Sequence, residues 1–76
     1  MTKQKFLEVI KANPVKVSRM HASYSDVILT VSNSIDADLV RFHFNENGLR
    51  MMPTVRVNDT CFNVIVLIPV KFDTVA

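Results

Sequence analysis

The sequence predicts an α+β domain, in which a short N-terminal helix packs on a mainly antiparallel sheet of about five strands. Three observations lead to this prediction: apolar residues at helical spacing near the start of the chain, a β-branched run after a polar turn, and an alternating segment that leads into Asn47 and Gly48. The 76 residues make a single domain, and the strands group as a hairpin followed by a three-strand meander.

Residues 3–12 are predicted to form the N-terminal helix. Thr2 is placed to cap it, because a threonine oxygen can accept a hydrogen bond from a free amide of the first turn. Apolar side chains then recur at helical spacing, namely Phe6, Leu7, Val9 and Ile10. Pro14 ends the helix because it pushes Asn13 out of the helical region. So short a helix is marginal alone, and its apolar stripe must lie on another element.

A first hairpin is predicted from residues 15–22 and 27–32. The four residues 23–26 read as its turn, and the strand that follows is rich in Val, Ile and Thr. This turn sets a register in which apolar residues share one face, with the pairs Ala22–Val27, Met20–Leu29 and Ser18–Val31.

The meander is predicted to begin with residues 39–44, which alternate between apolar and polar side chains. Asn47 and Gly48 follow, and this pair is a strong hairpin signal because both residues accept a positive φ. A two-residue turn there pairs apolar with apolar, in the order Phe44–Met51, Phe42–Pro53 and Val40–Val55.

The next turn of the meander is predicted at Asp59 and Thr60. It sets the pairs Val57–Phe62, Val55–Val64 and Met51–Ile68. Pro53 disagrees with a central strand because it has no N–H to donate, so we expect a bulge or an end to pairing near it.

Residues 35–47 also admit a helix. Ser34 would cap it, Asp36 and Asp38 would lie in its first turn, and Gly48 would follow its end. We prefer the strand because Val40, Phe42 and Phe44 alternate, and the helix is kept as the alternative.

The second face of the meander combines a small apolar centre with basic side chains around it. In the predicted register Met52 lies opposite Leu67 and Thr54 lies opposite Ile65. An apolar centre with a polar rim is typical of protein interfaces. The predicted partner-binding residues are Arg41, His43, Arg50, Met52, Arg56, Ile65 and Leu67. The alternative is a sheet curled into a small barrel, in which Ile65 and Leu67 are core.

The composition favours no catalytic or metal chemistry. Neither His21 nor His43 has a partner at a catalytic spacing, and a single cysteine, Cys61, makes no metal-binding motif. We therefore expect no enzyme, no catalytic residue, no metal and no cofactor. The longest apolar run, residues 64–70, is too short to span a bilayer, so we expect no membrane partner and a cytoplasmic protein, in a host cell if the chain is viral.

The function predicted from these features is that of a small, non-enzymatic protein-binding module. We expect an inhibitor or adaptor of a host protein, of viral or accessory origin, that self-associates as a dimer, because so short a chain buries too little surface to be very stable alone. The alternative is a nucleic-acid-binding protein that contacts phosphates through Arg41, Arg50 and Arg56. The net charge of +2 is mild for that role.

Overall fold

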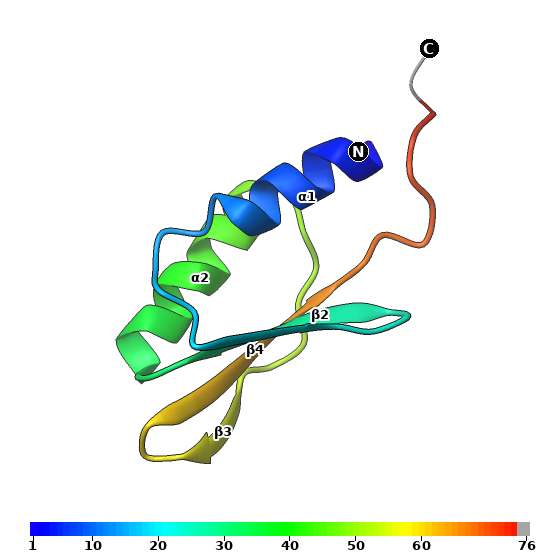
Figure 1. The fold of residues 1–76 in the computed structure, drawn as a ribbon. Coiled ribbons are helices and arrows are strands. Elements are labelled where there is room, and N and C mark those ends of the chain that lie inside the picture. The colour runs from blue at the N-terminus through cyan, green and yellow to red at the C-terminus, as the bar shows by residue number, and fades with distance from the viewer. Residues whose placement is uncertain (75–76) are drawn as a thin grey trace.

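The computed structural model describes residues 1–74, which form two layers. Two helices lie on one face of a four-stranded antiparallel sheet whose strand order is β1-β2-β4-β3 (Figure 1). The elements follow the chain as α1 (Lys3–Lys11), β1 (Arg19–Ala22), β2 (Asp26–Val31), α2 (Ser34–Glu46), β3 (Val55–Asn58) and β4 (Cys61–Leu67). The predicted α+β class is confirmed, but the prediction of one helix and five strands is wrong: the described residues form two helices and four strands.

Helix α1 begins and ends close to where the sequence predicts. The side chain of Thr2 accepts a hydrogen bond from the Lys5 amide at 3.1 Å. Ala12 closes the helix, and the Asn13 side chain then accepts from the amide of Val15, which turns the chain at Pro14. The buried side of α1 consists of Phe6, Val9 and Ile10.

The first hairpin has its predicted register from Arg19 to Ala22, but its first strand is shorter than the predicted residues 15–22. The predicted pair Ser18–Val31 is not part of the ladder, because the Ser18 amide donates to the Thr30 carbonyl at 2.9 Å. Met20 lies opposite Leu29 and Ala22 lies opposite Val27. Strand β2 then pairs along its other side with β4, from Asp26 opposite Leu67 to Val31 opposite Phe62. This pairing joins residues far apart in the chain, and it makes β2 and β4 the central strands.

The strand predicted at residues 39–44 is instead part of helix α2. Asn33 caps the helix, because its side chain accepts from the Asp36 amide at 2.8 Å. The buried residues Ala37, Val40 and Phe44 recur at three and four residues and form one helical side. Phe42, which completed the apparent alternation, points to solvent and is 64% exposed.

Asn47 and Gly48 end α2 and do not form a hairpin. Gly48 has a φ of 75°, while Asn47 has a φ of −97°. The Leu49 amide donates to the Phe44 carbonyl, and the Gly48 amide donates to the Asn45 carbonyl, both at 3.0 Å. This is the Schellman arrangement of a helix end, which needs positive φ only at the glycine. The hairpin prediction is therefore wrong, together with its pairs Phe44–Met51, Phe42–Pro53 and Val40–Val55, and the alternative helix is confirmed.

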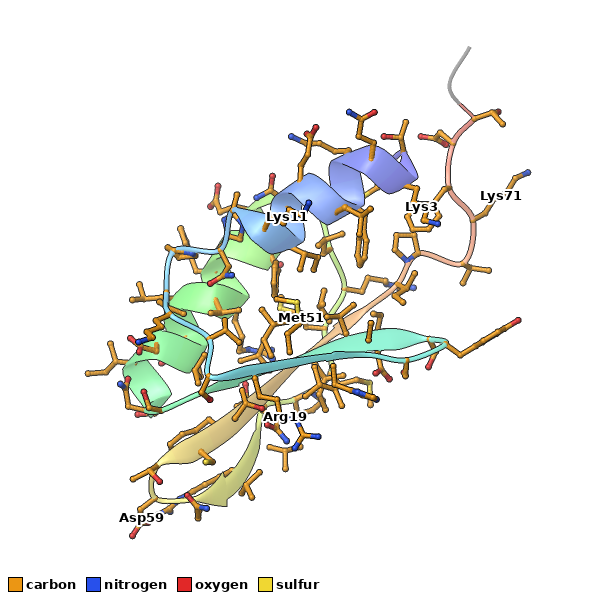
Figure 2. All side chains as sticks on the ribbon, in the orientation of Figure 1. Lys3, Lys11, Arg19, Met51, Asp59 and Lys71 are labelled. Carbon is orange, nitrogen blue, oxygen red and sulfur yellow. The ribbon has the colours of Figure 1, made fainter. Side chains whose placement is uncertain are left out.

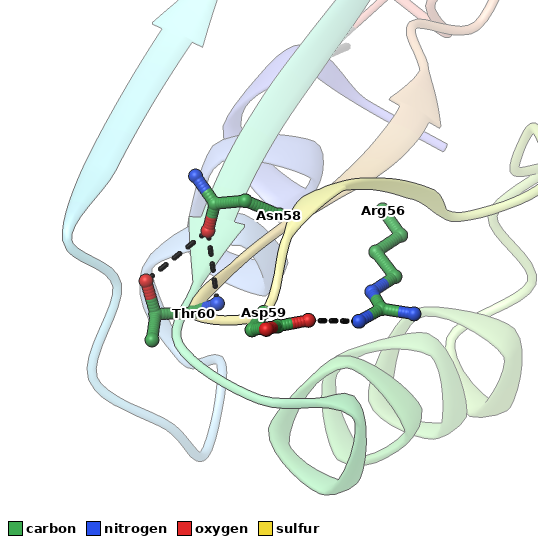
Figure 3. A network of polar contacts seen from close by, with 4 residues as sticks. All are labelled: Arg56, Asn58, Asp59 and Thr60. Atoms are coloured by element: carbon green, nitrogen blue, oxygen red, sulfur yellow. Dashed lines mark hydrogen bonds and ion pairs between the residues drawn. The ribbon is translucent and has the colours of Figure 1, made fainter.

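The turn at Asp59 and Thr60 is confirmed, but the register beyond it is not the predicted one. Asn58 lies opposite Cys61, and a bulge follows, so that Arg56 rather than Val57 lies opposite Phe62. The turn is braced by two side-chain contacts, Arg56 to Asp59 and Asn58 to Thr60 (Figure 3). One extra residue in a strand exchanges its two faces, so the bulge turns Val55 away from the helices.

The expected disturbance at Pro53 is present. Strand β3 begins only at Val55, and before it Met51 makes an isolated bridge to Val66. The pairs predicted as Val55–Val64 and Met51–Ile68 are therefore replaced by Val55–Asn63 and Met51–Val66.

The core lies between the sheet and the two helices. In the described part of the chain its buried side chains are all hydrophobic. The sheet contributes Val27, Leu29, Val31, Val64 and Val66, which the two helices and Leu49 cover.

Candidate protein-binding surface

The sheet has one face covered by the helices and one face that no described helix covers (Figure 1). We call the second the open face. Because side chains alternate along a strand, the residues of β2 and β4 that lie between the buried ones point to it. Figure 2 shows Arg19 on this side of the sheet and Met51 on the side of the helices.

Three rows of side chains cross the open face, since residues opposite each other in a register share a face. The first row runs Arg19, Thr30, Asn63 and Val55. The second row runs His21, Ile28 and Ile65, and it ends at Met52, whose amide donates to the Ile65 carbonyl at 2.9 Å. The third row runs Asp26, Leu67 and Arg50, where the Leu67 amide donates to the Arg50 carbonyl.

The centre of the open face is apolar and partly exposed. Ile28, Ile65 and Leu67 are each half-buried, although they lie on the two central strands. Met52 and Val55 extend the apolar area towards β3, and each is 47% exposed. A group of apolar side chains left in contact with water is typical of surfaces that bind a partner.

Polar groups surround this apolar centre. Thr30 donates a hydrogen bond from its hydroxyl to the side-chain oxygen of Asn63 at 2.7 Å, which satisfies both groups within the face. Together with Arg19, His21 and Ile28, these two residues line a shallow hollow next to β1. Arg19 and Arg50 stand at opposite corners of the face, and Asp26 is its acidic group.

The structure brings together four of the seven predicted partner-binding residues. Arg50, Met52, Ile65 and Leu67 lie side by side on the open face, with Met52 next to Ile65 rather than next to Leu67 as the predicted register had it. The barrel alternative is not formed, because the described strands make an open sheet with β1 and β3 at its edges.

Arg41 lies elsewhere, on helix α2. Its guanidinium donates to the Met52 carbonyl at 2.7 Å and contacts the Thr54 hydroxyl at 3.4 Å. These bonds satisfy backbone and side-chain groups where Pro53 interrupts the sheet. Arg41 is thus tied to the covered side of the molecule, because residues 39–44 are helical.

His43 also belongs to α2 and joins the two helices. Its Nε2 lies 2.8 Å from the carbonyl oxygen of Val9 in α1. A carbonyl only accepts, so the ring nitrogen must carry the proton and donate it. The half-buried ring serves the packing of α1 on α2, on the far side of the sheet from the open face.

Arg56 is the third of the seven that is not on the open face. The bulge places it opposite Phe62, whose ring packs against the core, so Arg56 lies on the side of the helices. Its guanidinium is paired with Asp59 across the turn (Figure 3).

Sequence reasoning missed the half of the open face that the first hairpin supplies. His21 and Ile28 are opposite each other in the hairpin register, which was predicted correctly. That register already placed them on the face away from Leu29. The missing information was the pairing of β2 with β4, which sets Ile28 beside Ile65.

The titratable side chains do not converge on a reaction centre. His21 is on the open face, the His43 ring is bonded to Val9, and Cys61 starts β4 after the turn. Among residues 1–74 no three His, Cys, Asp or Glu side chains lie close enough to hold a metal ion. No helix in the same residues has the length and apolar character needed to cross a bilayer.

Comparison of the chain with models of protein families, with curated proteins and with solved structures found no match.

Proposed function

We propose that this protein is a non-enzymatic binding module that docks on another protein through the open face. The observation that carries the proposal is the partly exposed apolar group Ile28, Ile65, Leu67 and Met52, on a face that none of the described helices covers. Arginines at two corners agree with it, because interfaces are enriched in Arg and in apolar anchors and have a polar rim. An inhibitor or adaptor of a host protein, of viral or accessory origin, stays the predicted role.

Nucleic-acid binding has less support. Arg41 and Arg56 point to the helix side and each bonds within the chain, so only Arg50 of the three predicted phosphate contacts is on the open face. The aromatic rings that commonly stack bases in single-strand binders are also lacking among the residues of the open face.

The test is a capture experiment with variants that introduce the same lysine at different positions on the surface. Met52→Lys and Ile65→Lys put a charge into the open face, whereas Phe42→Lys puts the same charge on the solvent side of α2, where Phe42 is 64% exposed. We expect proteins from host extract to be retained by wild type and by Phe42→Lys and to be lost with both open-face variants. Titration of the purified partner should show a loss of about thirtyfold or more for Ile65→Lys.

The opposite pattern would overturn the proposal. Retention that survives both open-face variants and is lost with Phe42→Lys would place the binding site on α2. Retention that disappears on nuclease treatment would support the nucleic-acid alternative. Circular dichroism of each variant confirms that the fold is intact.

A further inference from the structure

The sheet has two edges, and they differ in how they are protected from pairing with another chain. At β3 the edge is irregular, because Pro53 interrupts the pairing and a bulge follows Arg56. Prolines, bulges and charged side chains are the usual means of blocking an edge. From Arg19 to Ala22 strand β1 has a continuous register with β2 and contains no proline. Its charged residue, Arg19, stands at its first position, and its irregularity lies just before it, where the Ser18 amide donates to the Thr30 carbonyl at 2.9 Å.

The free backbone groups of β1 can be identified from its ladder with β2. The Ser23 amide donates to the Asp26 carbonyl at 2.8 Å, and bonded pairs recur at every second residue of an antiparallel ladder. His21 and Arg19 therefore bond to β2. The N–H and C=O groups of Met20 and Ala22 point away from the sheet, and all four residues of β1 are exposed.

We infer that a second copy of this chain pairs with β1 edge to edge, antiparallel and about a two-fold axis at His21. This register lets Met20 of each copy bond to Ala22 of the other, which uses every free backbone group of β1. On the helix side it places the exposed Met20 side chain, 48% accessible, against Ala22 of the second copy. On the open face His21 meets His21 of the second copy as a non-bonded pair.

Charge complementarity selects a second copy as the occupant. In this register Arg19 of one copy lies opposite Ser23 of the other, and Ser23 lies opposite Asp26 in its own hairpin. The guanidinium can therefore reach over the small serine to the Asp26 carboxylate, roughly 10 Å away between Cα atoms. The contact occurs twice by symmetry. Among the described residues neither Arg19 nor Asp26 has an ion-pair partner within its own chain.

The pairing gives the dimer predicted from the sequence a defined surface. It joins two four-stranded sheets into one of eight strands and sets two open faces next to each other. It does not require that the open face bind a partner, because the edge groups are backbone atoms of β1.

A cysteine placed at the axis tests the register. In a Cys61→Ser background, His21→Cys brings two thiols together on Cα atoms about 4.5 Å apart, inside the range that a disulfide spans. Ile28→Cys is the matched control, since position 28 lies on the same face of the sheet as position 21 and directly opposite it on β2. The two copies of position 28 would lie about 14 Å apart, which is three strand spacings. In a glutathione redox buffer we expect a covalent dimer from His21→Cys and monomer from Ile28→Cys. Equal cross-linking of both variants, or of neither, overturns the proposal.

Charge exchange is the second measurement, made by sedimentation equilibrium. Arg19→Glu should weaken the dimer about three- to thirtyfold, because two exposed ion pairs are lost. Arg19→Glu combined with Asp26→Arg should recover the affinity. The edge pairing would be overturned if the chain were monomeric at millimolar concentration, or if the double variant did not recover the affinity. It would also be overturned if Ile65→Lys abolished the dimer while Arg19→Glu left it unchanged.

Discussion

The two faces of the sheet are made by the same strands but differ in their exposure to water. On the covered face Leu29, Val31, Val64 and Val66 are wholly excluded from water, at 0% exposure. On the open face the side chains between them, Ile28 and Ile65, are just as apolar but stay half-buried. The strands do not create this difference, since each alternates regularly. It comes from the helices, which cover one face only.

Strand β4 has apolar side chains on both of its sides. A strand that contributes to a core on one face only is expected to carry polar residues on its other face. Strand β4 follows this pattern at Asn63, which accepts a hydrogen bond from Thr30 on the open face. Ile65 and Leu67 depart from that pattern at the centre of the sheet. Their apolar character is not required to close the core, and this supports a role for the open face outside the monomer.

The largest expected effect comes from two neighbouring residues of β2. Leu29→Ala should reduce the free energy of unfolding by about 2–5 kcal/mol, because it leaves a cavity in the closed core. Ile28→Ala should cost about 1 kcal/mol, because a partly exposed side chain loses less buried area. Chemical denaturation of both variants checks the difference. Equal losses would show that the two faces are equally buried in solution.

The attachment of the covering layer is tested at His43. His43→Ala removes the donor to the Val9 carbonyl, and an unpaired, half-buried acceptor costs about 1–3 kcal/mol. Hydrogen exchange should speed up most in α1, which this bond fastens to α2. His43→Gln keeps an amide donor and serves as the control. The role given to His43 would be incorrect if α1 exchanged at the wild-type rate in His43→Ala.

The smallest effect distinguishes the helix end at Gly48 from a hairpin. Gly48→Ala should cost about 1–2 kcal/mol, because the φ of 75° strains any residue with a Cβ, although no atom lies within 4 Å of the added group. Asn47→Ala should cost about 0.5–1 kcal/mol, the value of its bond to the His43 carbonyl. A type I′ hairpin needs positive φ at both positions, so comparable and large losses in thermal denaturation would favour the hairpin.

The features predicted correctly are those that close neighbours in the chain define. Thr2 and Pro14 bound α1, the turn at residues 23–26 sets the first hairpin, and Asp59 with Thr60 turns β3 into β4. Each depends on capping or turn chemistry within a few residues. The common face of Arg50, Met52, Ile65 and Leu67 was predicted as well, because these residues keep the same phase in the true and the predicted registers.

The errors arise where one local pattern fits two structures. Asn47 and Gly48 suit a hairpin and a helix end alike, since both use a positive φ at glycine. Val40 and Phe44 are four residues apart, a spacing that places them on one face of either a strand or a helix. Phe42 between them completes a period of two, which favoured the strand. The bulge after Arg56 then exchanged the two faces of β3, which no pattern in the sequence had signalled.

Short-range chemistry was thus enough to define α1, the first hairpin and the last turn. Tertiary contact decided that residues 34–46 are helical, that β2 lies beside β4, and which sheet face is left open. The reason is that a side chain becomes buried only when the helix and sheet layers pack together. Burying Ala37, Val40 and Phe44 against the sheet lowers the free energy of the helix by more than the exposure of Phe42 to water raises it.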